Sequence, residues 1–169
     1  MQKTVVILVG PKGAGKTYIG SLIEAALQVH FLRVERVLLD HVKRHDVPPD
    51  GLPRGGFDVE EAAIDDVLRT ANSVVFEATG SSVYFADVIE ALRAKYSVQL
   101  VRIRCPLDLC RRRAEQRDAT EQLPVTWAQF ESINAKANAV ELDWDLEVDN
   151  GPDVSTSTLM NALRPLLQV

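Results

Sequence analysis

The chain has 169 residues, with 24 acidic and 19 basic side chains, and its net charge is near -5 at neutral pH. This balance argues against a general nucleic-acid-binding protein, because binding to phosphate backbones needs a basic surface. No apolar run approaches the ~20 residues of a membrane-spanning helix. We therefore expect a cytoplasmic protein, a monomer or homodimer, that binds neither nucleic acid nor membranes.

Strand and helix patterns alternate along the chain. Continuous apolar runs predict strands buried on both faces, and apolar residues three and four apart predict helices. We expect strands at residues 4–9, 31–35, 73–78, 98–104 and 142–148. We expect helices at residues 15–28, 37–45, 58–70, 83–95, 107–117, 124–140 and 153–167. Asp153 or Ser155 would cap the last helix, and the proline- and glycine-rich segment 47–56 would be a loop.

This alternation predicts an α/β fold. Five strands separated by helices in so short a chain form a parallel sheet covered on both faces, which gives three α/β/α layers. The chain has no internal repeat, no low-complexity tract and no linker. We therefore expect a single domain over residues 1–169.

Two pairs of possible metal ligands have simpler interpretations. Cys105 and Cys110 have no histidine close in sequence, so buried free thiols are favoured over a disulfide or a metal pair. His41 and His45 are four residues apart on a predicted helix, which is a metal-binding spacing. Without a third ligand nearby, a solvated helix face is favoured for the histidines.

A glycine-rich segment joins the first predicted strand to the first predicted helix. Residues 10–17, GPKGAGKT, match every fixed position of the phosphate-binding loop (P-loop) pattern G-x-x-x-x-G-K-[ST]. Glycines let the backbone N–H groups point inward at phosphate oxygens, and the following helix adds its partial positive charge. Lys16 would reach the β- and γ-phosphates of ATP, and the Thr17 hydroxyl would bind Mg²⁺. The expected nucleotide-binding residues here are Gly10, Pro11, Lys12, Gly13, Ala14, Gly15, Lys16, Thr17 and Tyr18.

The P-loop motif alone does not separate a GTPase, a motor ATPase and a kinase. A GTPase carries an N-K-x-D segment that reads the base, whereas residues 134–137 read Asn-Ala-Lys-Ala in a predicted helix. The chain is also short for a motor domain.

Three further segments narrow the class. Residues 74–80 form an apolar strand that ends in Glu77 and turns at Gly80, and residues 106–117 place Arg113 and Arg117 four apart on one face of a helix that follows a proline. Residues 146–151 form a last strand and turn. Together these segments resemble the small P-loop kinases, the group of the adenylate, shikimate and gluconate kinases.

The resemblance implies a P-loop NTPase fold and a kinase that moves the γ-phosphate of Mg-ATP to a small metabolite or nucleotide. Lys16 and the two arginines would be catalytic, and a short lid over about residues 113–125 would close on the transferring group. Thr17 and Glu77 would hold the metal, and Asp149 would contact the nucleotide. Simpler alternatives remain: Glu77 would cap the next helix, and Arg113 and Arg117 would form a solvated basic face.

The resemblance is weaker for the phosphate acceptor, which would bind about residues 36–57. Shikimate-type kinases carry an acid near the end of the second strand, and Glu35 is the best match for this hydroxyl-orienting or general-base role. An exposed acid paired with Arg33 or Arg36 is the alternative. The expected substrate-binding residues are Glu35, Arg44, Arg54, Gly80 and Ser81, with the arginines binding an anionic acceptor.

Departures from the family patterns leave the acceptor open. Gly80-Ser81-Ser82 replaces the triple glycine of the shikimate kinases, and their carboxylate-binding arginine pattern is not recognisable. An ATP-binding regulatory module with little kinase activity is therefore a second hypothesis.

Overall fold

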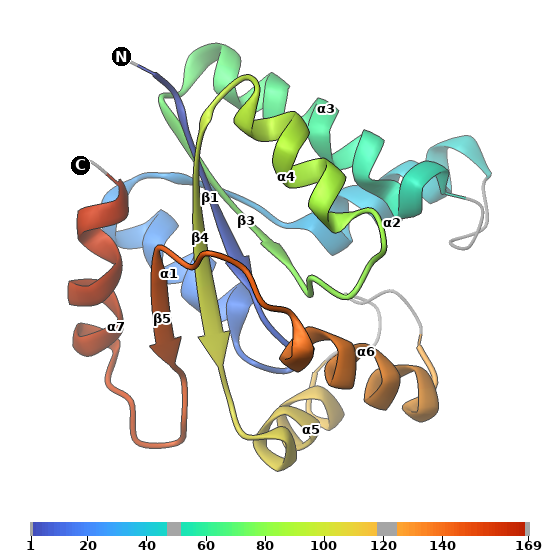
Figure 1. Cartoon of the computed structure of the whole chain (residues 1–169), viewed down its shortest axis with the longest axis vertical. Coiled ribbons are helices and arrows are strands. Elements are labelled where there is room, and N and C mark those ends of the chain that lie inside the picture. The colour runs from blue at the N-terminus through green and yellow to red at the C-terminus, as the bar shows by residue number, and fades with distance from the viewer. Residues whose placement is uncertain (1, 47–51, 118–124, 168–169) are drawn as a thin grey trace.

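The computed structural model describes residues 2–46, 52–117 and 125–167 (Figure 1). Its strands are Thr4–Val9 (β1), His30–Leu32 (β2), Ser73–Ala78 (β3), Ser97–Arg104 (β4) and Leu146–Asp149 (β5). Its α-helices are Lys16–Leu27 (α1), Val34–His45 (α2), Phe57–Thr70 (α3), Phe85–Arg93 (α4), Leu107–Glu115 (α5), Trp127–Ala139 (α6) and Thr156–Leu163 (α7). Short 3₁₀ helices cover Pro53–Gly56 and Arg164–Leu167.

The five strands form one parallel sheet in the order β2-β3-β1-β4-β5. β1 is central, and all of its residues are buried because the sheet is covered on both faces. Thr4 pairs in register with Ser73 of β3 and with Ser97 of β4. The carboxyl ends of these strands therefore lie together at the edge where open α/β sheets bind ligands.

The helices cover the sheet in two layers. α1 and α7 lie on one face, and α2, α3 and α4 on the other, while α5 and α6 lie beyond the carboxyl ends of the strands (Figure 1). Alternate residues of β1 enter the two resulting cores: Val6 and Leu8 pack with Ile23 of α1, and Val5 and Ile7 pack with residues of α3 and α4. The predicted α/β/α fold with five parallel strands is confirmed.

The second strand and helix begin and end differently from the prediction. β2 stops at Leu32, and Glu35 lies in the first turn of α2 and not near the end of a strand. β2 is an edge strand that pairs only through three residues with β3, so little ladder holds the chain extended beyond Leu32. An acid in the first turn also favours the helix electrostatically.

Three later boundaries also differ. β5 begins at Leu146 and not at Leu142, because the Asp145 carboxylate accepts the backbone N–H of Leu100 at 2.7 Å in place of a ladder bond. α5 ends at Glu115, so Arg117 lies just after the helix and the predicted shared helical face does not apply. Residues 53–56 of the predicted loop form a 3₁₀ turn, and residues 47–51 lie outside the described part of the chain.

Ser155 caps α7 by accepting the N–H of Thr158 at 3.1 Å. Cys105 and Cys110 are both free, and burial raises the pKa of the Cys110 thiol to about 12. The rings of His41 and His45 in α2 lie 4.4 Å apart at an interplanar angle of 39°. No group of three metal-binding side chains occurs among the described residues. In the same part of the chain, no helix is long and apolar enough to cross a membrane.

Candidate active site

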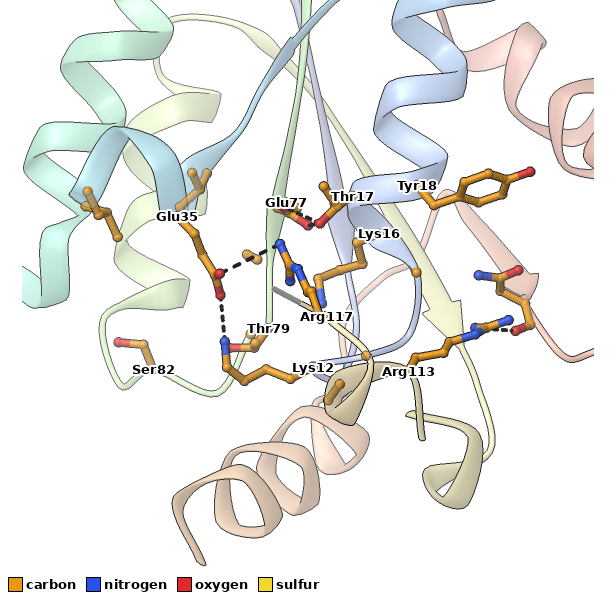
Figure 2. Close-up of a pocket in the computed structure, with 18 of the residues that line it drawn as sticks. Lys12, Lys16, Thr17, Tyr18, Glu35, Glu77, Thr79, Ser82, Arg113 and Arg117 are labelled. Carbon is orange, nitrogen blue, oxygen red and sulfur yellow. Dashed lines mark hydrogen bonds and ion pairs between the residues drawn. The ribbon is translucent and has the colours of Figure 1, made fainter. Parts of the chain in front are cut away.

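A cavity of about 560 Å³ opens at the carboxyl edge of the sheet, around the P-loop. In Figure 2, Glu35 and Ser82 lie on one side of Lys16 and Thr17, and Tyr18 and Arg113 lie on the other. We call these sides the α2–α3 half and the α1–α5 half, after the helices that line them. Val34, Glu35, Leu38, Phe57, Glu60 and Ser82 line the α2–α3 half, and Tyr18, Arg113, Gly151, Pro152 and Val154 line the α1–α5 half.

The P-loop has the curled backbone that its glycines predict. Gly13 and Gly15 have left-handed φ angles of 83° and 89°, and the N–H of Ala14 bonds the Pro11 carbonyl at 3.2 Å. Lys16 is buried at the start of α1 and donates to the carbonyls of Gly10 and Pro11, both at 2.8 Å. Burial lowers the pKa of its ammonium to about 8, against the opposing influence of nearby Glu77. A polyanionic ligand beside Lys16 would restore the ordinary preference for the charged form.

Glu77 and Thr17 lie side by side at the base of the cavity (Figure 2). The Thr17 hydroxyl is 2.9 Å and 3.1 Å from the two carboxylate oxygens of Glu77. Glu77 ends the buried stretch of β3, and Thr17 is in the first turn of α1, so the parallel pairing of β1 and β3 brings them together. The pair offers hydroxyl and carboxylate oxygens, which are hard-cation ligands, beside the P-loop.

Two asparagines hold the backbone of the P-loop, and the sequence analysis assigned a role to neither. Asn134 of α6 accepts from the Lys12 N–H at 2.7 Å and donates to the Lys12 carbonyl at 3.1 Å. Asn150, just after β5, donates to the Ala14 carbonyl at 2.7 Å. Both side chains are buried. No local pattern marks them, since their partners lie 122 and 136 residues away.

Replacing Asn134 by alanine should loosen the P-loop. The change leaves both backbone groups of Lys12 without their protein partner, which should cost about 1–3 kcal/mol of unfolding free energy. Denaturant unfolding measures this loss, and ATP titration should show weaker binding. Asn138→Ala, at an exposed position one turn further along α6, is the matched control. Equal stability of the two variants would contradict the role of Asn134.

An ion-pair chain joins three residues that line the cavity. Glu35 Oε1 lies 2.6 Å from the Lys12 ammonium, and Glu35 Oε2 lies 3.8 Å from the Arg117 guanidinium (Figure 2). The expected alternative partners of Glu35 are not used: Arg33 pairs with Glu24, and Arg36 is exposed. Glu35 therefore links the P-loop to the segment that follows α5.

The two arginines of the predicted catalytic pair both line the cavity but have different partners. Arg113 donates to the Asn150 carbonyl at 3.1 Å, in the α1–α5 half. Arg117 faces Glu35, and its backbone N–H bonds the Ala114 carbonyl, so that the chain still turns after the end of α5. They approach the P-loop from two directions. The rest of the expected lid, residues 118–124, lies outside the described part of the chain.

Glu60 of α3 is a cavity residue that the sequence analysis missed. Its side chain is 4% exposed, and its Oε2 has no hydrogen-bond partner among the described residues. Burial raises its pKa to about 8, with smaller contributions from Glu61 and Glu77. A sequence signal exists, because Glu60 falls on the apolar stripe of α3 between Phe57 and Ile64.

Glu60 should make the stability of the protein fall as pH rises. The carboxyl loses its proton near its ordinary pKa of 4.5 when the chain is unfolded, and near 8 when it is folded. Between these values the unfolded state binds fewer protons, so the free energy of unfolding falls with increasing pH. Glu60→Gln carries no such proton. Its stability relative to wild type should increase by about 2 kcal/mol between about pH 5 and about pH 6.5.

Denaturant unfolding across this pH range measures the effect. Glu61→Gln is the matched control, because Glu61 pairs with Arg54 and does not line the cavity. Its pH dependence should stay much closer to that of wild type than that of Glu60→Gln does, because Glu61 makes only a smaller contribution to the raised pKa of Glu60. A constant difference between Glu60→Gln and wild type would show that Glu60 ionises in the folded protein as it does in water.

The remaining predicted site residues divide into two groups. Gly10, Pro11 and Ala14 are buried in the P-loop but do not line the cavity. Gly80 lines the cavity, and Ser81 lies next to it and hydrogen-bonds the hydroxyl of Thr79. Three expected contacts are not brought to the cavity: Arg44, Arg54 and Asp149.

Local partners explain where these three lie. Arg44 is exposed in the last turn of α2. Arg54 is 2.6 Å from Asp58 and 3.1 Å from Glu61, so its charge is already used within its own segment. Asp149 is the last residue of β5, and its side chain pairs with Arg104 at 3.0 Å outside the cavity. Its neighbour Asn150 lines the cavity instead.

A P-loop after the central strand, an acid at the end of the neighbouring strand and arginines from the segment that begins with α5 define a nucleotide-phosphate site of the P-loop class. The chain belongs to the AAA domain family, which its sequence matches over residues 5–140. No curated protein matches it in sequence.

Solved structures share the whole fold at low sequence identity. A provisionally assigned kinase from Chloroflexus aurantiacus is 14% identical with a TM-score of 0.76, and the alignment covers 99% of this chain and 100% of that one. The APS kinase of Mycobacterium tuberculosis, in complex with AMPPNP and APS, is 17% identical with a TM-score of 0.65 and 99% of each chain covered. Shikimate kinase from Acinetobacter baumannii, in complex with shikimate, is 17% identical with a TM-score of 0.59, covering 98% and 92%. The fold is that of the small P-loop kinases, as the sequence resemblance predicted.

Proposed function

We propose that this protein is an Mg-ATP-dependent phosphotransferase that moves the γ-phosphate of ATP to a small-molecule acceptor. The observation that carries the proposal is the continuity of the cavity. The P-loop lies between its two halves, so a phosphate bound there is open to a second molecule from the α2–α3 half. The fold shared with kinases, one of them solved in complex with AMPPNP and APS, supports the same class of reaction.

The P-loop and the α1–α5 half would bind the nucleotide. Backbone N–H groups at the start of α1 and the Lys16 ammonium suit the phosphates, and Arg113 lies at the edge of this half. On nucleotide binding, Lys16 would exchange its two loop carbonyl acceptors for phosphate oxygens. That exchange places positive charge where the transferring group becomes more negative.

The residues present fit a magnesium ion. Glu77 and Thr17 are held together at the base of the cavity, and a cation between them would replace the hydrogen bond that now joins them. Thr17 would bind the ion directly, and Glu77 would hold a water of its shell. When bound, the ion would neutralise charge on the phosphate oxygens.

Glu35 is the proposed group that orients the acceptor. In the transfer, the bond between the γ-phosphorus and the oxygen bridging it to the β-phosphate breaks, and a bond from the acceptor hydroxyl oxygen to the γ-phosphorus forms. The hydroxyl proton would pass to the carboxylate of Glu35, which lies beside Lys12 and Arg117. ADP and the phosphorylated acceptor are the products. Arg117 would leave its ion pair with Glu35 and bind the oxygens of the transferring phosphoryl group.

A regulatory ATP-binding module is the second candidate. The observation that favours it is the Lys12–Glu35 pair at 2.6 Å, which ties the proposed acceptor-orienting acid to the P-loop. A protein that uses this contact to sense nucleotide would need no acceptor.

ADP formation from ATP, followed across a panel of metabolites and nucleotides, separates the two functions. A compound that stimulates ADP formation and is itself phosphorylated, as shown by mass spectrometry, is the expected result. Tight ATP binding without stimulation by any compound would favour the module.

A further inference from the structure

Glu60 presents an unsatisfied hydrogen-bond acceptor to the cavity. It lines the cavity, is more than nine-tenths buried, and its Oε2 finds no donor within the described protein. Leaving a buried polar atom without a partner is unfavourable, and a donor on a bound molecule would remove that cost. The α2–α3 half is therefore prepared for a ligand with a hydrogen-bond donor.

The walls around Glu60 are apolar. Val34, Leu38 and Phe57 are all buried and all line the cavity. They come from α2 and α3, the same two helices that carry Glu35 and Glu60. A ligand in this half gains from burying an apolar face against them.

No positive charge is left over for the acceptor. The cavity-lining cations of the described chain are Lys12, Lys16, Arg113 and Arg117. All of them come from the P-loop or from the segment that begins with α5, where a nucleotide triphosphate needs them. Arg54, the expected acceptor-binding cation, is held by Asp58 and Glu61. The segments outside the described chain, residues 47–51 and 118–124, contain no lysine, arginine or histidine.

We propose that the phosphate acceptor carries no anionic group: it is an uncharged or cationic hydroxylated molecule with an apolar face that donates a hydrogen bond to Glu60. The inference rests on the phosphotransferase function proposed above, because it names the second substrate of that reaction. A carboxylate or phosphate placed here would find Lys12 and Arg117 already paired with Glu35, and it would bring an uncompensated charge into a poorly solvated cavity, which is costly. This assignment replaces the expectation of an anionic acceptor bound by Arg44 and Arg54.

The test uses hydroxylated compounds in three charge classes. The full-length protein is incubated with Mg-ATP and adenosine, cytidine and glucose (uncharged), glucosamine and ethanolamine (cationic), or AMP, CMP, shikimate and gluconate (anionic). ADP formation is measured, and binding of each compound to the protein–ADP complex is measured separately by thermal shift. Glu60→Gln and the control Glu61→Gln are assayed in the same way.

We expect turnover and binding only with uncharged or cationic compounds. Glu60→Gln should lower kcat/KM for them by about 3- to 10-fold, the usual loss for a hydrogen bond between uncharged groups, because Glu60 is largely protonated at neutral pH. Glu61→Gln should stay within about twofold of wild type, since side chains that contact no substrate change kcat/KM little. Turnover or binding of an anionic compound overturns the inference but leaves the phosphotransferase standing. Binding that is restricted to non-anionic compounds and depends on Glu60, without any turnover, supports the site and overturns the phosphotransferase. Binding by none of the compounds, or equal behaviour of Glu60→Gln and wild type, overturns the inference.

Discussion

Lys16→Ala should lower kcat by about 10²–10³-fold, the usual effect of removing one preorganised donor to a developing negative charge. The Lys16 ammonium is buried at the centre of the cavity, between the P-loop carbonyls and Glu77. In so dry a position its charge is weakly screened, and water that enters the alanine variant replaces it poorly.

The fold should survive this substitution. Lys16 makes its described hydrogen bonds only to the carbonyls of Gly10 and Pro11, and removing a buried ammonium also removes its desolvation cost. Steady-state kinetics with circular dichroism and a thermal melt distinguish lost chemistry from lost structure. Lys16→Met, which keeps side-chain length without charge, should be equally inactive, and Lys43→Ala, on the exposed part of α2, should be fully active. Undiminished turnover by Lys16→Ala would refute the role of the P-loop.

Gly13→Ala should be the most destabilising small substitution in the site. Gly13 has a φ of 83°, and a Cβ there would lie 2.1 Å from the carbonyl oxygen of Cys110 and 2.7 Å from its carbonyl carbon. These are backbone atoms of α5, which cannot rotate away as a side chain can. Left-handed strain and overpacking together should cost about 2–5 kcal/mol, lowering Tm by roughly 5–15 °C in a chain of this length.

Gly151→Ala is the matched control for this prediction. It lies on the same cavity, yet a Cβ at Gly151 would have nothing within 4 Å. Its stability should stay within about 0.5 kcal/mol of wild type. Thermal and denaturant unfolding of both variants give the comparison. Similar melting curves would mean that the P-loop moves away from α5 without cost, contrary to the close packing described above.

Local sequence patterns were sufficient to predict the fold and the phosphate-binding part of the site. The β1 run, the P-loop and the acid at the end of β3 each have a short pattern with a physical cause, and the structure places Lys16, Thr17 and Glu77 together. Glu60 was also within reach of such reasoning. An acid between Phe57 and Ile64 on the apolar face of a helix is unusual, so the helical periodicity of α3 was enough to predict that Glu60 is buried.

Other parts of the site depend on tertiary structure. Glu35 seemed strand-terminal because the three-residue β2 gives no local sign of where it ends. Arg54 and Asp149 were predicted from sequence alone, but they pair with Asp58 and Arg104, and those pairings follow from the folded backbone. A sequence pattern indicates the chemistry of a side chain. It does not indicate which neighbouring side chain will pair with it in the folded protein.

The two asparagines that hold the P-loop also bear on how the protein reaches its native state. The loop begins at the tenth residue, but its carbonyl and N–H groups are fixed by side chains 122 and 136 residues later in the chain. Contacts of such long sequence separation form late, because a large loop must close first. During synthesis, the first four strands would thus leave the ribosome before the two asparagines that give the P-loop its final shape. Only the completely folded chain would then bind nucleotide tightly. ATP would therefore stabilise the native state of the whole chain against unfolding.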